Sequence, residues 1–347
     1  MQPLDCCDEE FGRSSTELIR VCPPYAAATF RYRTRGASKE NGTQMHRHIA
    51  LAALFVFGAA HTALAADPAR CRDLNRRYET GKSQLTAVEV SLTLFAAADR
   101  NCVDLATQLL DQGASVDARD RLGARPLSHA ARSGHLEMVD LLLQRGAPIN
   151  ERNLAGSTAL YEAAERGQAA VVQRLIDKGA DLDLKGRSGI SPVAAAAFAG
   201  RAALVKMLLA HGADGRTPDD TGKPPIVYAA ASGQLDIVKQ LLALNIDLNA
   251  RYANDLTLLM WASGPDENVA EAQALEVVSY LIEAGAHIDE ADARGRTALM
   301  TAAEGGHPEI AKLLLAHGAD PALKDKAGKR AADLTVLSSL REMLTPR

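Results

Sequence analysis

Aromatic residues and cysteine are scarce in this chain of 347 residues. Phenylalanine, tyrosine and tryptophan together make up 4% of it, tryptophan occurs once, and cysteine occurs five times. A β-sandwich usually draws on aromatic and β-branched residues, so this composition disfavours one, and so few cysteines exclude a disulfide-dense miniprotein. Hydrophobic residues nonetheless reach 47%. Because these are mostly alanine, leucine and valine, the chain can bury a sizeable core of thin, closely stacked helices.

A large excess of one charge is also absent. Lysine and arginine number 39 against 43 aspartate and glutamate residues, which gives a formal net charge of −4. A dedicated nucleic-acid-binding protein usually carries a strong basic excess, so we expect no nucleic acid among the partners. The composition as a whole also excludes a collagen-like chain and a multi-span membrane protein.

Motifs for catalysis and for metal or cofactor binding are missing as well. The chain has no G-x-S-x-G, no H-E-x-x-H and no G-x-G-x-x-G after a strand. Thr80–Ser83 resembles the end of a phosphate-binding loop, but Arg76 stands where that loop needs a glycine. His211, His287 and His317 lie far apart in the sequence. We therefore expect no catalytic residue, no cofactor and no metal, and no enzymatic activity.

One apolar segment lies near the N-terminus. Residues 49–60 are uncharged, follow the short basic stretch 45–48 and precede Ala63-Leu64-Ala65. These are the three parts of a secretory signal peptide. We predict a signal peptide over 45–65 that is cleaved between Ala65 and Ala66.

The position of this segment leaves two alternatives open. Residues 1–44 show no apolar periodicity, so they are either a mis-assigned start that precedes the true initiator, Met45, or a disordered N-terminal extension. If the segment 49–66 stays uncleaved, it anchors the chain in a membrane.

Glycines recur with a constant period through the rest of the chain. Two sets are spaced 33 residues apart: Gly123, Gly156, Gly189 and Gly222, and then Gly146, Gly179 and Gly212. Between them lies an alanine pair followed by a run rich in valine and leucine, for example Ala130-Ala131 and then 139–143. Such a period is typical of a repeat architecture.

Each unit predicts a turn, a short helix, a reversal and a longer helix. The alanine pair lets neighbouring inner helices approach closely, and the valine and leucine run faces the next unit. The final glycine supplies the left-handed residue that ends the outer helix. Basic residues precede this glycine and fit the negative end of the helix dipole, namely Arg145, Lys178, His211 and His317.

These residues resemble the ankyrin repeat. The pattern is most complete in 153–185 and 292–324, where Thr158, Leu160 and Gly179 are among the residues that fill it. The resemblance implies an all-α ankyrin-repeat solenoid, built from helix-turn-helix repeats with short β-turn tips. The seven repeats of 87–324 are expected at 87–119, 120–152, 153–185, 186–218, 219–251, 252–291 and 292–324, between an N-terminal capping helix in 66–86 and a C-terminal capping half-repeat in 325–347.

The sequence departs from the family pattern in two ways. No unit has the histidine that usually opens the inner helix, so we expect its turn hydrogen bonds to be weaker or differently made. The sixth unit has 40 residues, with the extra seven between Ser263 and Leu275. Pro265 should end the inner helix, and Asn268 with Glu271 has capping-box spacing. We predict an outer helix extended by up to two turns; the alternative is a loop insertion without a role.

The residue before each alanine pair is expected on the inner helices, near a concave groove. Tyr228 and Trp261 occupy this position in adjacent units, and aromatic side chains are good binding anchors. The alternative is that they only stack between neighbouring helices. The turn tips beside them add the other candidate partner-binding residues: Arg121, Arg187, Asp220, Asn254 and Arg294.

Two cysteines, Cys71 and Cys102, remain after the predicted cleavage. In an oxidising compartment such a pair is a candidate disulfide. The bridge would close a loop of about 30 residues and stabilise the first repeat. The alternative is a pair of separate reduced thiols.

The resemblance implies a non-catalytic, monomeric scaffold that binds a partner protein through its concave groove. With the export signal, the chain resembles the periplasmic ankyrin proteins of Gram-negative bacteria. We therefore expect it in the periplasm or secreted. The alternatives are a membrane-tethered scaffold through 49–66 and a host-directed effector. No residue identifies the partner.

Overall fold

The computed structural model describes residues 68–265 and 268–345. Residue contacts divide the chain into two units, 1–58 and 59–347, and every described residue lies in the second. The expected signal peptide, its cleavage position and everything before it lie outside the described residues.

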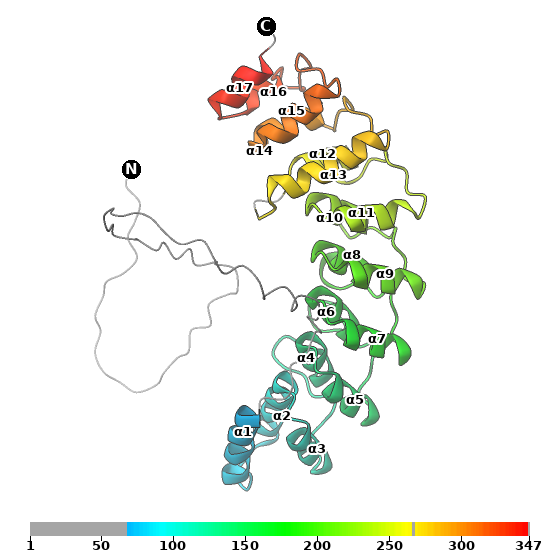
Figure 1. Cartoon of the computed structure of the whole chain (residues 1–347). Coiled ribbons are helices and arrows are strands. Elements are labelled where there is room, and N and C mark those ends of the chain that lie inside the picture. The colour runs from blue at the N-terminus through cyan, green and yellow to red at the C-terminus, as the bar shows by residue number, and fades with distance from the viewer. Residues whose placement is uncertain (1–67, 266–267, 346–347) are drawn as a thin grey trace, which may run out of the picture. The chain divides into compact units, whose positions relative to one another are not determined.

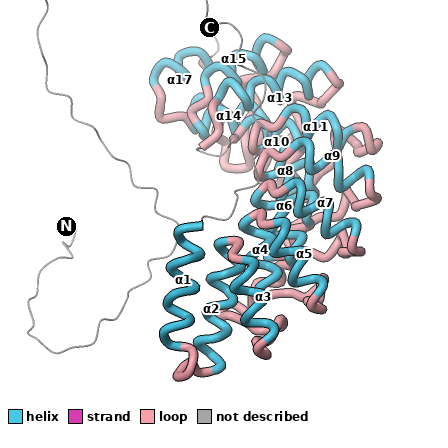
Figure 2. Tube along the Cα trace, turned by 60° about the horizontal axis from the view of Figure 1, so that its bottom comes forward, coloured by secondary structure: helices cyan, strands magenta, loops and turns pink. Residues whose placement is uncertain are grey.

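Helices form two layers in this unit, and the described residues contain no β-strand (Figures 1 and 2). The inner layer contains α2 (Ala87–Arg100), α4 (Pro126–Ser133), α6 (Ala159–Arg166), α8 (Pro192–Phe198), α10 (Pro225–Ala231), α12 (Leu258–Ser263), α14 (Ala298–Gly305) and α16 (Ala331–Leu334). The outer layer contains α3 (Val103–Asp111), α5 (Leu136–Gln144), α7 (Ala169–Asp177), α9 (Ala202–Ala210), α11 (Leu235–Leu242), α13 (Glu271–Glu283) and α15 (Pro308–Ala316). Consecutive inner helices from α2 to α14 contact each other, and so do consecutive outer helices from α3 to α15. The expected all-α solenoid is confirmed.

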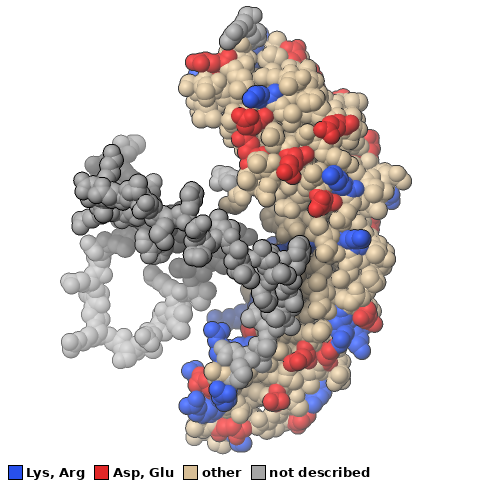
Figure 3. Space-filling model, in the orientation of Figure 1, with Lys and Arg blue, Asp and Glu red and all other residues tan. Residues whose placement is uncertain are grey.

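The stack curves, and the inner helices lie on its hollow side (Figures 1 and 3). Alanine pairs explain how close the inner helices come, because both members are fully buried, as in Ala130-Ala131 and Ala163-Ala164. Outer helices bury one apolar stripe each, for example Met138, Val139 and Leu142 of α5. Burying a leucine or valine side chain contributes about 1.5–3 kcal/mol, so repetition of these contacts holds neighbouring units together.

Left-handed residues end the outer helices, as the sequence predicts. Gly146 and Gly212 have φ angles of 85° and 93°, and an added Cβ at either would meet no atom within 4 Å. Glycine is therefore favoured there by backbone conformation rather than by lack of space. The fifth repeat has Asn245 at this position, with a φ of 59°.

Aspartate and asparagine side chains build most of the turns that precede the inner helices. Oδ1 of Asp120 accepts hydrogen bonds from the amides of Leu122 and Ala124, both at 2.8 Å. The same two hydrogen bonds, from the backbone amides two and four residues later in the chain, recur at Asn153, Asp219, Asp292 and Asp325. Asx hydrogen bonds thus hold these turns in a repeat that lacks the family's histidine.

The sixth repeat confirms one prediction and contradicts another. Helix α13 has 13 residues where the other outer helices of the repeats have eight or nine, an extension of about one turn. The predicted capping box of Asn268 and Glu271 is wrong: the helix begins after Ala270, without a side-chain cap. Glu271 turns instead to the next repeat, where Oε1 accepts hydrogen bonds from the amides of Glu309 and Ile310.

Additional helices lie at both ends of the array. Helix α1 (Pro68–Gly81) packs against α2, and its Cys71, Leu74 and buried Tyr78 pack into the hydrophobic core. At the other end α16 is followed by α17 (Ser338–Leu344), whose Leu340 and Leu344 are buried. The residues after 324 thus form a pair of short helices.

Candidate partner-binding surface

Tyr228 and Trp261 lie on the adjacent inner helices α10 and α12, and both are partly exposed. Lys223, in the turn before α10, is placed between them: its Nζ lies 5.3 Å from the centroid of the Tyr228 ring and 5.7 Å from that of Trp261. Phe198, at the end of α8, meets the Tyr228 ring edge-on with centroids 6.0 Å apart. We call these four residues the aromatic–lysine cluster.

The cluster presents apolar surface to solvent. Phe198 is 55% exposed, although it is a large hydrophobic residue. The Trp261 ring packs partly against the core, and its buried indole N–H has no hydrogen-bond partner among the described residues. No ring contact joins Tyr228 to Trp261 in the described part of the chain, so the lysine, and not mutual stacking, connects them.

Asp219 fixes the orientation of the Tyr228 ring. Its Oδ2 accepts a hydrogen bond from the Tyr228 hydroxyl, while Oδ1 builds the turn. Burial raises the pKa of Asp219, but the hydrogen bonds from Tyr228, Lys223 and Thr221 outweigh burial, and the pKa lies below its usual value. The pKa of Tyr228 is raised by burial and by the Asp219 carboxylate. At neutral pH the pair is therefore a phenol donating to a carboxylate.

The same nine-residue relation recurs in two other repeats. His129 Nε2 lies 3.1 Å from Oδ2 of Asp120, and the Asn153 amide donates to Glu162 at 3.3 Å. The turn residue thus shapes the turn with one side-chain atom and holds the concave-facing side chain with the other. Burial, and then the charge of Glu165, raises the pKa of Glu162.

His129 also joins two repeats. Its Nδ1 lies 2.9 Å from Oδ1 of Asp99 in α2, and its ring packs on Phe95 with centroids 5.0 Å apart. Burial lowers the pKa of His129, but the hydrogen bonds to Asp99 and Asp120 and the charge of Asp99 outweigh burial, so the pKa is raised. The pKa of Asp99 is lowered, because the contacts of His129 and Arg132 outweigh its burial.

The five turn-tip residues of the predicted surface are all exposed: Arg121, Arg187, Asp220, Asn254 and Arg294. They lie on different turns and are not brought into one cluster. Neighbouring tips are linked through their backbones, since the amide of Asp220 donates to Ser188 at 3.1 Å. Arg294 pairs with Asp292 at 3.0 Å. On the face shown in Figure 3, charges of both signs are interspersed.

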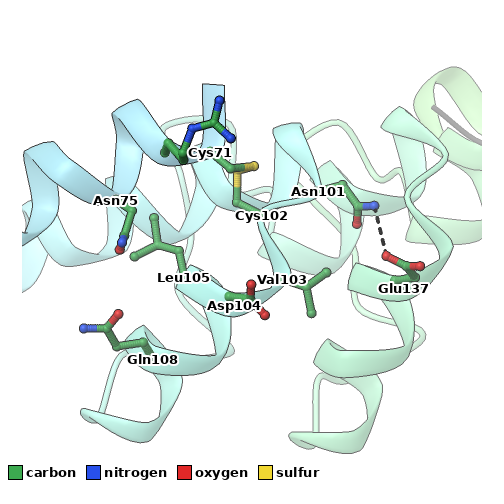
Figure 4. A pocket seen from close by; sticks show the side chains of 10 residues that line it. Cys71, Asn75, Asn101, Cys102, Val103, Asp104, Leu105, Gln108 and Glu137 are labelled. Atoms are coloured by element: carbon green, nitrogen blue, oxygen red, sulfur yellow. Dashed lines mark hydrogen bonds between the residues drawn. A yellow bond between two sulfur atoms is a disulfide. The ribbon is translucent and has the colours of Figure 1, made fainter. Parts of the chain in front are cut away.

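A second hollow, of about 440 Å³, lies between α1 and the first outer helices (Figure 4). Cys71 and Cys102 border it and are joined as a disulfide, with Cα atoms 5.4 Å apart. Both polar side chains and the apolar Val103 and Leu105 line the rest, and Asn101 donates to Glu137 at 3.4 Å across its edge. The structure thus ties the N-terminal helix to the start of α3.

Comparison with known families decides the identity of the fold. The family described as ankyrin repeats (3 copies) matches residues 94–186, 183–252 and 250–325. The chain is an ankyrin repeat protein. No curated protein matches it. Ankyrin repeats generally mediate protein–protein interactions and are typically non-catalytic modules.

Two features are absent from the described residues of this ankyrin repeat protein. No three histidine, cysteine, aspartate or glutamate side chains gather there in a way that could hold a metal ion. None of the described helices combines the length and the apolar character needed to cross a bilayer.

Sequence reasoning missed half of the aromatic–lysine cluster. Phe198 follows an alanine pair instead of preceding one, and Lys223 lies in a turn. A constant spacing of nine residues separates Asp120 from His129 and Asp219 from Tyr228. This spacing could have predicted that each turn aspartate contacts the concave-facing residue of its own repeat.

Proposed function

We propose that this ankyrin repeat protein is a non-catalytic, monomeric scaffold that binds a partner protein through the concave side of its inner helices. The observation that carries the proposal is the aromatic–lysine cluster. Exposed aromatic side chains held in fixed orientations are favourable anchors, because little conformational freedom is lost when they are covered. The flanking turn tips, among them Arg187 and Asp220, would form a polar rim.

The partner test uses the double variant Tyr228→Ala and Trp261→Ala. Tagged chains are isolated from the native host, and the co-isolated proteins are compared by quantitative mass spectrometry. The proposal predicts that one protein recovered in near-stoichiometric amount with the native chain falls at least tenfold with the double variant. Phe198→Ala, at an exposed position, should lower the recovery of the same protein without affecting the fold. Unchanged recovery with both variants, each shown by circular dichroism to be folded, contradicts the proposal.

We further propose that the chain is exported to the periplasm or secreted. Two observations support this: the signal-like segment 45–65 and the cysteine pair, since disulfides persist in oxidising compartments. Fractionation with intact mass measurement separates the alternatives. A chain beginning at Ala66 in the periplasm supports export. A chain that retains residues 1–65 in the membrane fraction favours a tethered scaffold, and recovery inside a host cell favours an effector.

A further inference from the structure

Lys223 differs from Arg132 and Arg294 in having no carboxylate partner. Arg132 lies 3.6 Å from Asp99, and Arg294 lies 3.0 Å from Asp292. Among the described residues no aspartate or glutamate forms an ion pair with Lys223. Its ammonium group is instead held beside two aromatic rings.

The two acids nearest in sequence are committed elsewhere. Asp219 accepts the amide of Lys223 itself at 2.9 Å, together with the Thr221 amide and the hydroxyls of Thr221 and Tyr228. The carboxylate of Asp220 lies against Gly189 of the preceding turn. Neither forms an ion pair with the ammonium group.

The surroundings of the ammonium group select the kind of anion. Two ring faces remove part of its water, and a partly desolvated cation attracts a carboxylate more strongly than one in bulk water. The adjoining surface is apolar, with Phe198 55% exposed. A polyanion is disfavoured, because two acids, Asp219 and Asp220, lie in the same turn as Lys223. The matching ligand therefore carries one carboxylate next to an apolar side chain.

Resting on the proposed function, we infer that the aromatic–lysine cluster takes an aspartate or glutamate of the partner protein that is adjacent to an apolar residue. The carboxylate pairs with Lys223 between the Tyr228 and Trp261 rings. The apolar side chain covers Phe198. The cluster is thus the point at which this scaffold selects its partner.

The single tryptophan makes this site directly observable. The full chain is titrated with two capped tetrapeptides, acetyl-Gly-Asp-Leu-Gly-amide and its Asn-containing counterpart, while the emission of Trp261 is recorded. The inference predicts that the aspartate peptide binds at least tenfold more tightly. In Lys223→Gln the two peptides should bind equally, and Lys223→Arg should restore part of the preference.

Lys206→Gln is the matched control, because Lys206 is an exposed lysine on the outer helix α9 and should leave the preference unchanged. Equal binding of the two peptides to the native chain, no emission change with either, or a preference that survives in Lys223→Gln overturns the inference. So does binding of a DNA oligonucleotide in place of the peptides. If the peptides fail while the Tyr228→Ala and Trp261→Ala variant still loses its partner, the concave interface stands and only the carboxylate assignment falls.

Discussion

The carboxylate of Glu271 accepts a hydrogen bond from the backbone amide of Glu309 at 2.9 Å, and so caps the outer helix of the following repeat. The residue at the start of that helix, His307, gives no side-chain cap of its own. On its other side the extended segment packs against the fifth repeat, where Val269 and Gln273 contact Gly233. The insertion thus contacts the repeats before and after it, and a loop without a role does not describe it.

Removing this cap should destabilise the array. Glu271→Ala is expected to lower the free energy of unfolding by about 1 kcal/mol, because two amides of α15 lose a charged acceptor. Urea denaturation followed by circular dichroism measures the change. Glu276→Ala, at an exposed position on the same helix, is the control and should stay within about 0.5 kcal/mol of the native chain. Equal losses in the two variants would show that Glu271 acts only through helix propensity.

The fifth repeat should gain stability from glycine at position 245. Asn245 has a φ of 59° where most other repeats have glycine, and a side chain in this conformation costs up to about 1 kcal/mol. Asn245→Gly is expected to raise the free energy of unfolding by about 0.5 kcal/mol, since the greater freedom of unfolded glycine offsets part of the gain. The reverse exchange, Gly212→Asn, should lower it. A loss of stability in Asn245→Gly would mean that the asparagine side chain has a favourable contact.

Reduction of the disulfide should release the N-terminal helix. Only one side chain of α1 among those described, Tyr78, is buried, so the Cys71–Cys102 bond carries much of the attachment. The variant with serine at both positions is expected to lose about 3 kcal/mol of stability. Hydrogen exchange should show faster exchange in α1 and α2 but not in α14. Exchange rates in α1 and α2 that stay the same after reduction would contradict this account.

The Asp99–His129 pair should make the first repeat interface sensitive to pH. The pKa of His129 is raised above 6.5, so its contribution is complete below pH 6.5 and is lost as pH rises through the higher folded-state value. The pKa of Asp99 is lowered below 3.8, so its contribution is present above pH 3.8 and is lost at lower pH. The pair therefore contributes most to the stability of the folded chain between pH 3.8 and pH 6.5.

Chemical denaturation at two pH values tests this. The difference in unfolding free energy between the native chain and His129→Gln should be larger at pH 5.5 than at pH 8.5. An NMR titration of the imidazole in Asp99→Asn should show its pKa moving down toward the usual range. A difference that is independent of pH would mean that His129 contributes through packing on Phe95 alone.

The fold could be predicted because each repeat carries the same local signals. Alanine pairs, glycines at helix ends and apolar runs act within one unit or between neighbours, and a period of 33 makes them visible together. The longer helix of the sixth repeat could be predicted because that repeat has 40 residues instead of 33. The capping box at Asn268 failed because its partner, Glu271, makes a contact 38 residues away, and local spacing does not reveal such a competitor.

The candidate surface could be predicted only in part for a related reason. Tyr228 and Trp261 were found because they occupy a repeated position. Lys223 and Phe198 were not, because they reach the same place from a turn and from a helix end. The role of Asp219 depends on a side chain bonding in two directions at once, which a sequence pattern shows only when several repeats are aligned.

Site-specific photo-crosslinking in the native host tests the central claim most directly. A photoreactive phenylalanine derivative replaces Phe198 on the inner helix α8 or Lys206 on the outer helix of the same repeat, and adducts are detected by immunoblotting and mass spectrometry. The account predicts one major protein adduct at position 198 and none at position 206. It also predicts that this adduct is lost when Tyr228→Ala and Trp261→Ala are added. Adducts of equal yield at both positions, or an adduct at position 206 alone, would contradict binding through the concave face.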